Sequence, residues 1–523
     1  MKLNEKGLQD RAQWEKKGYR LPNYDRKTVK MATKENPFWI HFGPGNIFRA
    51  FQANVVQTLL NKGEIDRGLI VAEGYDYEIV QKMNQPCDDY SILVTLKSDG
   101  TVEKTVIGSI VESLTVDVEN EKDWTRLKEI FRKDSLQMAS FTITEKGYRV
   151  LDVKNSESYM GKIATLLYER YKADKKPIAM VSMDNCSHNG DKLKEAIQMF
   201  AKHWVENQMV EVGFLDYIND KTKVSFPWSM IDKITPRPDE AIEKLLRADG
   251  IEGLEPVITS KNTYVAPFVN AEETEYLVIE DEFPNGRQEV LEQGGFLFTE
   301  RQTVDKVEKM KVCTCLNPLH TSLAIFGCLL GYEKIAEEMK DPELIRLVKI
   351  IGYIEGLPVV VNPKVLNPKE FLDKVLRVRI PNPFMPDTPQ RIATDTSQKL
   401  AIRFGETIKA YQESKELNVA DLKMIPLVFA GWIRYLMGID DNGRRFELSP
   451  DPMLDKLRPY VANFVLGKNE QIEEKIKPLL EDTNIWGVNL YEVGLAQKVV
   501  EDFEQMTKGL GAVRETLKKQ VWA

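Results

Sequence analysis

Histidine and cysteine are scarce in this sequence. Its 523 residues include 4 histidines and 5 cysteines. An odd number of cysteines in so long a chain does not suit a disulfide framework and indicates reduced thiols in a cytoplasm. Cys313 and Cys315 are spaced like metal ligands, but no second ligand pair lies near them in the sequence. The spacing therefore gives no reason to expect a zinc site.

A surplus of positive charge is also missing. Lys and Arg number 72 and Asp and Glu 80, which leaves a net charge of −8. This balance excludes a general nucleic-acid binder, which needs basic residues to neutralise phosphates, and argues against docking on an anionic membrane. We expect a small-molecule ligand, with no nucleic acid or membrane as partner, and either a monomer or a dimer.

We expect no signal peptide at the start of the sequence, because Met1 to Arg20 is charged throughout and has no apolar core. Val312 to Tyr332 is uncharged and long enough to be flagged as a membrane span. However, Asn317, Pro318 and His320 within it are costly in hydrocarbon. We therefore expect a buried helix of a soluble, cytoplasmic protein.

Hydrophobic residues make up 42% of the chain, enough for large buried cores. In the first part, strand-like apolar runs alternate with amphipathic helical patterns, which predicts βαβ units and a mostly parallel sheet. The strand-like runs lie in 38–60, 68–72, 138–144 and 177–183. Later, long helical patterns dominate, at 321–339, 342–353, 396–415, 424–437 and 491–518. We predict an α/β domain over residues 1–300, beginning with a polar surface arm, and a mostly α-helical domain over 301–523.

A glycine-rich turn follows the first apolar run. It reads Gly43, Pro44, Gly45, Asn46, Ile47, Phe48 and Arg49. Glycines let a backbone turn tightly and approach a pyrophosphate at the start of the next helix. The third glycine of the usual fingerprint is replaced by Phe48, so an ordinary loop is the alternative. The position between a strand and a helix favours a dinucleotide site.

Acidic residues follow the second predicted strand, where a carboxylate binds the adenosine ribose of NAD. Glu73 and Asp76 are the candidates, and Glu78 is a third. No arginine follows them closely to bind a 2′-phosphate, which favours NAD over NADP. The alternative for each acid is a solvated loop charge.

Lys311, Asn317 and His320 form a polar group in or beside the uncharged stretch. Burial disfavours the charged form of lysine, so Lys311 is a candidate general base. Asn317 can donate to a developing alkoxide, and His320 can bond a neighbouring hydroxyl. The structural alternatives are that Asn317 caps a helix with Pro318 at its first position, and that His320 is a satisfied core residue.

Two further segments are polar where a core would be apolar. Ser182 to Asn185 ends a predicted strand, where α/β enzymes place functional residues. Arg391 and Lys399 are eight residues apart and would share one face of a helix. The alternative is a solvated face on which Arg391 pairs with Asp395 four residues on.

Taken together, these segments resemble the mannitol dehydrogenase family of polyol-specific long-chain dehydrogenases. The resemblance spans most of the chain, in the family's order. It is carried by the stretches HFGPGNIFRAFQ (41–52), SFTITEKGY (140–148), SMDNCSHNGDKL (182–193), KVSFPWSMIDKITP (223–236), EKMKVCTCLNPLHTSLAIFGCLLGY (308–332) and RIPNPFMPDTPQRIATDTSQK (379–399).

The resemblance implies a Rossmann-type N-terminal domain, a mostly helical C-terminal domain, NAD as cofactor and no metal. It implies that Lys311 is the general acid/base and that Asn185 and Asn317 hold the substrate oxygen. His320 would orient the substrate. The remaining implied roles are proton passage by Asp232 and Glu308, and substrate binding by Arg391 and Lys399.

One departure concerns the interval between Lys311 and Asn317, which is six residues here and five in the relatives compared. On a continuous α-helix, one extra residue would rotate everything beyond it by about 100°. Pro318 disfavours a helical backbone at Asn317. We therefore expect a separate segment before Asn317, or a bulge that absorbs the additional residue.

Three functions remain open at this stage. The first is reduction of a keto sugar acid, in the pair D-fructuronate/D-mannonate or the pair D-tagaturonate/D-altronate, and we favour it. The second is a mannitol or arabinitol 2-dehydrogenase acting on neutral polyols. The third is a non-catalytic dinucleotide-binding sensor, which the retained lysine, asparagines and histidine disfavour. A sugar acid needs a cationic clamp, for which Arg377 and Arg379 are candidates.

Overall fold

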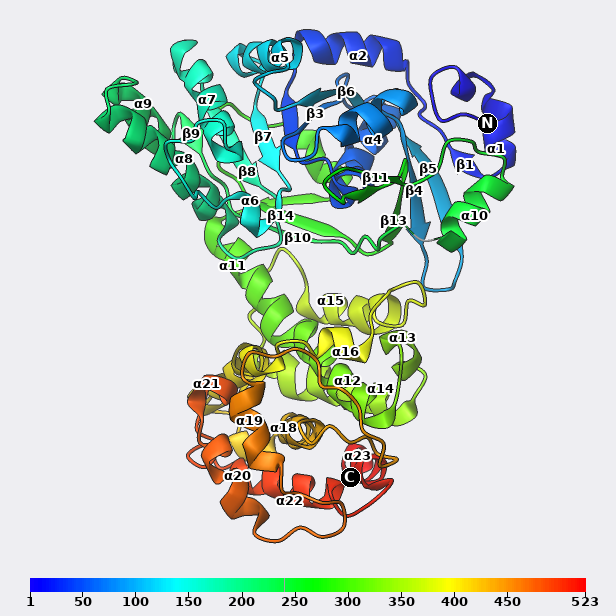
Figure 1. The fold of residues 1–523 in the computed structure, drawn as a ribbon, viewed down its shortest axis with the longest axis vertical. Coiled ribbons are helices and arrows are strands. Elements are labelled where there is room, and N and C mark those ends of the chain that lie inside the picture. The colour runs from blue at the N-terminus through cyan, green and yellow to red at the C-terminus, as the bar shows by residue number, and fades with distance from the viewer. Residues whose placement is uncertain (239) are drawn as a thin grey trace. The chain divides into compact units, whose positions relative to one another are not determined.

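The computed structural model describes residues 1–238 and 240–523. The chain forms two compact units. One comprises Met1–Lys97 and Thr101–Asp305, and the other comprises Ser98–Gly100 and Lys306–Ala523. The first contains the sheets and the second is built mainly of helices (Figure 1).

The first unit is built on a six-stranded sheet in which every neighbouring pair is parallel. The strands are β2 (Trp39–Phe42), β3 (Leu69–Glu73), β6 (Ile110–Thr115), β7 (Met138–Phe141), β8 (Ile178–Ser182) and β9 (Val224–Ser225). Their order across the sheet is β6-β3-β2-β7-β8-β9. Numbered along the chain, this is the 3-2-1-4-5-6 order of a Rossmann fold, so the predicted fold class is confirmed. The order reverses between β2 and β7, where such sheets bind dinucleotides.

Both faces of this sheet are buried, because successive side chains of a strand point to opposite faces. Ile40 and Phe42 lie in one apolar cluster, and Trp39 lies in the other. The helices that cover the first face are α5 (Glu121–Arg132), α7 (Tyr159–Lys172), α8 (Asn189–Glu206) and α9 (Val212–Asn219). The second face packs against α4 (Gln52–Lys62).

Three smaller sheets complete the first unit. The four-stranded one has the order β1-β5-β4-β13, formed by β1 (Tyr19–Arg20), β5 (Val102–Ile107), β4 (Ser91–Leu96) and β13 (Phe268–Glu272). The others pair β10 (Ser229–Asp232) with β14 (Tyr276–Glu280) and β15 (Phe296–Thr299), and β11 (Val257–Ile258) with β12 (Tyr264–Val265).

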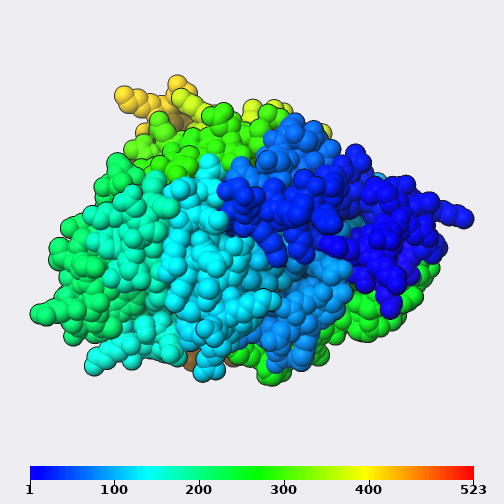
Figure 2. Space-filling view, turned by 90° about the horizontal axis from the view of Figure 1, so that it is seen from above, coloured from blue at the N-terminus to red at the C-terminus, as the bar shows by residue number. Residues whose placement is uncertain are grey.

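The N-terminal arm packs on this first unit. β1 pairs with β5, and Trp14 of α1 (Arg11–Lys16) has an exposed fraction of 0%. α2 (Arg26–Glu35) packs against β6. In the space-filling view the arm, in dark blue, spreads over the surface of the unit (Figure 2). The arm is therefore part of the α/β unit.

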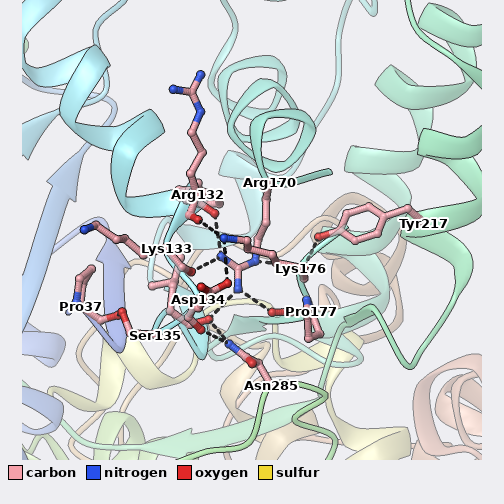
Figure 3. A network of polar contacts seen from close by, with 12 residues as sticks. Pro37, Arg132, Lys133, Asp134, Ser135, Arg170, Lys176, Pro177, Tyr217 and Asn285 are labelled. Atoms are coloured by element: carbon pink, nitrogen blue, oxygen red, sulfur yellow. Dashed lines mark hydrogen bonds and ion pairs between the residues drawn. The ribbon is translucent and has the colours of Figure 1, made fainter. Parts of the chain in front are cut away.

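Arg170 ties together the amino ends of β7 and β8. This arginine of α7 is fully buried, and its guanidinium donates to five main-chain carbonyls (Figure 3). The acceptors are the carbonyls of Phe131, Lys133, Leu136, Lys176 and Pro177, at 2.7–3.2 Å. Its charge is thus balanced by fixed backbone dipoles at the edge opposite the carboxyl ends of the strands.

The second unit is helical, as predicted. Its α-helices include α11 (Arg301–Met310), α12 (Asn317–Leu330), α13 (Ile335–Glu338), α14 (Pro342–Lys349), α15 (Pro368–Lys374), α16 (Pro389–Ile392) and α17 (Glu406–Glu413). They continue with α18 (Met424–Tyr435), α19 (Leu454–Val461), α20 (Ile472–Leu480), α21 (Thr483–Trp486), α22 (Ala496–Met506) and α23 (Ala512–Trp522).

Two predicted helices are each split in two. The pattern at 491–518 is divided between α22, which ends at Met506, and α23, whose N-cap residue is Gly511 with φ +76°. The pattern at 321–339 is divided between α12 and α13, because Gly331 has φ +80°. Glycine adopts this left-handed conformation readily, and it ends the helix before it.

The helical run Arg301–Leu330 is long and apolar enough to cross a membrane, and 78% of its most apolar window is buried inside the protein. Burial of this extent is typical of a core helix. The prediction of a buried helix over the uncharged stretch agrees with this packing.

Candidate active site

The glycine-rich turn lies at the switch point of the large sheet, directly after β2. Gly43 has φ +80°, and a Cβ atom on it would lie 2.5 Å from the carbonyl oxygen of Thr142. Both its conformation and its surroundings therefore require glycine. α3 (Asn46–Ala50) starts within the turn, with Gly45 as its N-cap residue. This is the strand–turn–helix arrangement that brings backbone close to a dinucleotide.

A buried hydrogen-bond chain fixes the turn to β7. Trp39 Nε1 donates to Ser140 Oγ (2.6 Å), and Thr142 Oγ1 donates to the Gly43 carbonyl (2.7 Å). His41 lies between them, with Nδ1 2.7 Å from Ser140 Oγ and Nε2 2.8 Å from Thr142 Oγ1. The Thr142 proton is committed to Gly43, so His41 Nε2 carries the hydrogen and Nδ1 accepts. Burial lowers the pKa of His41 well below its ordinary value, which keeps the ring neutral.

Phe48 stands where the usual fingerprint has its third glycine, and Arg49 follows it. Phe48 is buried and stacks on His41, with ring centroids 3.6 Å apart. The buried guanidinium of Arg49 donates to the Ala266 carbonyl and to Asn46 Oδ1, while its Nε is enclosed without a partner among the described residues. Burial lowers the pKa of Arg49 to about 10. A cation with an unused donor beside this turn suits an anionic phosphate group.

The predicted ribose acids lie after β3 and already have internal partners. Glu73, the last residue of β3, accepts from the backbone amides of Tyr75 (2.8 Å) and Asp76 (3.0 Å). Burial raises the pKa of Glu73. Asp76 is also buried, and it accepts from Thr259 Oγ1 at 2.5 Å. Their role in binding ribose stays a prediction.

Asp184 lies in the segment Ser182 to Asn185, which the sequence singled out without a specific role for this residue, and it holds the neighbouring loop by hydrogen bonds. Its carboxylate accepts from the amides of Ile143 (2.9 Å) and Thr144 (2.8 Å) and from the Tyr148 hydroxyl (2.6 Å). Thr144 has φ +64°, a strained conformation for a β-branched residue. Asp184 thus holds the segment after β7 in a conformation that its sequence disfavours, at the switch point of the sheet.

Asn185 and Asp232 also belong to the first unit. Asn185 is exposed, three residues after the end of β8. Asp232 is the last residue of β10 and is buried. Both stay predicted site residues.

Lys311 stands at a π-helical turn. η5 (Lys311–Cys315) is π-helical, and the Leu316 amide donates to the Lys311 carbonyl (3.1 Å), five residues back. A π turn takes one residue more than an α turn, so it absorbs the additional residue before Asn317. The predicted bulge is confirmed. Two further π turns pack against η5, namely η6 (Ile350–Gly356) and η10 (Ala401–Gly405), and π turns are frequent at functional sites.

α12 begins at Asn317, with Pro318 second, so Leu316 is the N-cap where Asn317 was expected. Lys311 is buried, and Asn317, His320 and Glu308 are half-buried. Within this unit the structure thus places Lys311, Asn317 and His320 on the consecutive elements η5 and α12, with Glu308 three residues before Lys311 on α11.

Asp387 joins two predicted substrate-binding residues. Its Oδ2 lies 3.9 Å from His320 Nε2, and its Oδ1 forms an ion pair with Arg391. The alternative in which Arg391 pairs with Asp395 is wrong, because α16 ends at Ile392 and Asp395 has φ +54°. For the same reason Arg391 and Lys399 do not share one helix face. The sequence offered no local indication of Asp387, since it lies 67 positions after His320.

Within residues 1–238 and 240–523, no group of three or more His, Cys, Asp or Glu side chains is arranged to hold a metal ion. The five cysteines are free thiols. Proton transfer by Lys311, with Asn317 and His320 on the element that follows it, stays a prediction.

Two family models match this chain. The mannitol dehydrogenase Rossmann domain matches residues 38–291, and the mannitol dehydrogenase C-terminal domain matches residues 303–507. The D-mannonate oxidoreductase of Thermotoga maritima is 53% identical over 100% of this chain and 99% of its own length.

Two solved structures have the same fold. The mannitol 2-dehydrogenase of Pseudomonas fluorescens, in a ternary complex with NAD and D-mannitol, has a TM-score of 0.65, with 26% identity and 99% of each chain covered. A D-sorbitol dehydrogenase in substrate-free form has a TM-score of 0.74 at 23% identity, covering 95% of this chain and 97% of its own. The identity and coverage, together with the two matched domains, show that the chain is an oxidoreductase of the mannitol dehydrogenase family.

Proposed function

We propose that this chain reduces a keto sugar acid with NADH, and that the pair D-fructuronate/D-mannonate is its substrate and product. The observation that carries the proposal is the 53% identity to a D-mannonate oxidoreductase along the whole chain. The tagaturonate/altronate pair is the second choice of acid. The mannitol 2-dehydrogenase with NAD and D-mannitol bound, at 26% identity, supports NAD as cofactor and makes a neutral polyol the runner-up substrate.

The proposed division of labour follows the two units, with residues 1–300 binding the dinucleotide and 301–523 binding the substrate. The Gly43–Arg49 turn and Glu73 would hold the cofactor, and the bound cofactor supplies a hydride to the carbonyl carbon. The fit is supported by the forced glycine conformation at Gly43 and by the unpartnered Nε of buried Arg49.

The chain's own residues would handle the oxygen and its proton. Lys311 would give a proton to the oxygen during reduction and take it back during oxidation, with Asp232 and Glu308 passing it toward water. Asn185 and Asn317 would donate hydrogen bonds to the oxygen as negative charge develops, and His320 would orient the substrate. We also place the enzyme in the cytoplasm, which cell fractionation would test.

The test is oxidation of NADH by the purified protein with D-fructuronate, D-tagaturonate and D-fructose in parallel, repeated with NADPH. We expect the highest kcat/KM with D-fructuronate and NADH. A preference for D-fructose would replace the proposal with a dehydrogenase that acts on neutral polyols. No turnover with any sugar would favour a binding module instead.

The residue assignment has its own test. Lys311→Ala should lower kcat by roughly two to four orders of magnitude, because general acid–base catalysis contributes about that much. NADH binding, followed by fluorescence, should be retained. Lys306→Ala, which removes an exposed lysine of the same helical run, is the matched control. Near-normal turnover of the Lys311 variant would remove it from the mechanism.

A further inference from the structure

Two positive charges share one helical turn in the second unit. Arg403 lies in η10, and its backbone amide donates to the carbonyl of Lys399 at 2.9 Å. Both side chains are half-buried. Within the part of the chain that the structure describes, neither forms an ion pair with a carboxylate; Asp395 and Asp451 act on Lys399 only at longer range. Like charges at this spacing destabilise a helix.

The guanidinium of Arg403 is only partly used by the protein. Its Nη1 donates to Thr321 Oγ1, and its Nε and Nη2 have no hydrogen-bond partner among the described residues. Burial lowers the pKa of Arg403 to about 10, with no acid nearby to oppose the shift. The neighbouring Lys399 donates to the Thr394 carbonyl, and burial together with Arg403 lowers its pKa. The two neighbouring positive charges contribute little to folding. Their placement suits the binding of an anion from outside the chain.

The contacts place Arg403 next to the proposed reactive group. Thr321, which accepts from Arg403, in turn donates to the Asn317 carbonyl at 2.9 Å. η10 also packs against η5, which begins at Lys311, and against α12. α17, which follows η10 directly, also contacts η5, because Thr407 Oγ1 donates to the Cys313 carbonyl at 3.4 Å. The guanidinium is therefore one helical turn along α12 from Asn317.

We propose that Arg403, with Lys399 beside it, binds the carboxylate of the sugar acid and so sets the preference for acids over neutral polyols. This inference rests on the proposed function. In a keto hexuronate, the carboxylate lies at the opposite end of the carbon chain from the ketone, so a cation displaced from Lys311 and Asn317 along the same elements suits it. Two N–H donors of one guanidinium match the two oxygens of a carboxylate, and a polyol hydroxyl offers no such partner.

The arginines expected from the sequence have other surroundings. Arg377 lies near Asp373 and Tyr353, where its charge acts on their pKa values. Arg379 is 1% exposed. Arg377 is therefore a suitable control, because it removes one positive charge from the same unit.

The experiment compares Arg403→Met, Arg403→Lys and Arg377→Met with the wild type on D-fructuronate and D-fructose. For Arg403→Met, we expect the ratio of kcat/KM for the acid to that for the neutral sugar to fall by about two orders of magnitude, mostly through KM for the acid. Arg403→Lys should retain part of the preference for the acid, because it keeps the positive charge but loses the planar pair of N–H donors. Arg377→Met should leave the ratio unchanged.

Thermal unfolding with D-mannonate and NAD gives a second readout that does not need turnover. D-Mannonate should raise the unfolding temperature of the wild type and of Arg377→Met, and not that of Arg403→Met. An unchanged ratio, or an equal loss on both sugars, overturns the inference; so does equal stabilisation of Arg403→Met by D-mannonate. A wild type that neither reduces nor binds sugar acids overturns the proposed function itself.

Discussion

Arg170 is fully buried and Arg403 is half-buried, and neither has a carboxylate partner among the described residues. Burial lowers the pKa of each to about 10. They differ in what their nitrogens contact. Arg170 donates to five carbonyls at the amino ends of two strands, whereas Arg403 has one hydroxyl partner.

The difference separates a structural cation from one that can bind a ligand. Five fixed carbonyl dipoles accept from the guanidinium of Arg170, so its charge belongs to the folded state. Arg403 keeps unused donors beside the elements that carry Lys311 and Asn317. A buried charge is thus informative about function only after its hydrogen bonds have been counted.

The largest expected effect comes from removing Arg170, the arginine whose donors bond to five carbonyls. Arg170→Met should lower the free energy of unfolding by about 3–5 kcal/mol, because it leaves five carbonyl groups without their donor. Arg403→Met should leave the stability of the ligand-free protein unchanged or slightly higher, since it removes an uncompensated charge. Urea unfolding of both variants measures the contrast.

Arg132→Met is the control for the first variant, because Arg132 is half exposed and its partner Glu169 keeps Lys172 as a second cation. We expect it to cost less than about 1 kcal/mol. A large loss of stability in Arg403→Met would break the comparison and make both arginines structural.

Buried carboxylates also differ in how many hydrogen bonds they accept. Asp184 is one that accepts three. Asp184→Asn should lower the free energy of unfolding by about 1–3 kcal/mol, because an amide NH₂ would face a backbone donor at Ile143 or Thr144. The strained segment after β7 would lose its anchor, so KM for NADH should rise more than kcat falls. Tyr148→Phe, which removes one of the three donors, should have a smaller effect on both. An unchanged KM for NADH in Asp184→Asn would limit its role to stability.

Local patterns were sufficient to predict much of this molecule. Alternating apolar runs predicted the parallel sheet, and Pro318 together with the six-residue interval predicted the irregular turn at Lys311. Each of these features depends on residues close together in the sequence.

The remaining contacts could not be predicted, because they join distant segments. Arg403 contacts Thr321 across 82 residues, and Asp387 lies near His320 across 67. Asp184 lay inside a recognised motif, but its partners Ile143 and Thr144 are on another strand's loop. The alternative that paired Arg391 with Asp395 is wrong because the helix is shorter than its pattern suggested.

The smallest expected effect concerns Asp502, a buried carboxylate of α22 with a single hydrogen-bond donor. Gln520 Nε2 donates to it at 2.6 Å, and burial raises its pKa from 3.8 to about 6. The fold disfavours the charged form of Asp502, so its contribution to stability is most favourable below about pH 4 and is lost as the pH rises to about 6.

Asp502→Asn keeps the hydrogen-bond acceptor without the charge, and it should stabilise the protein by about 1–2 kcal/mol at pH 8. The shift in the pKa of Asp502 sets an upper limit of about 3 kcal/mol on this gain. Urea unfolding between pH 4 and 8 should show this gain shrinking toward zero at pH 4, whereas exposed Asp455→Asn should show no such trend. A gain that does not depend on pH would mean that packing, and not the uncompensated charge, limits stability at this position.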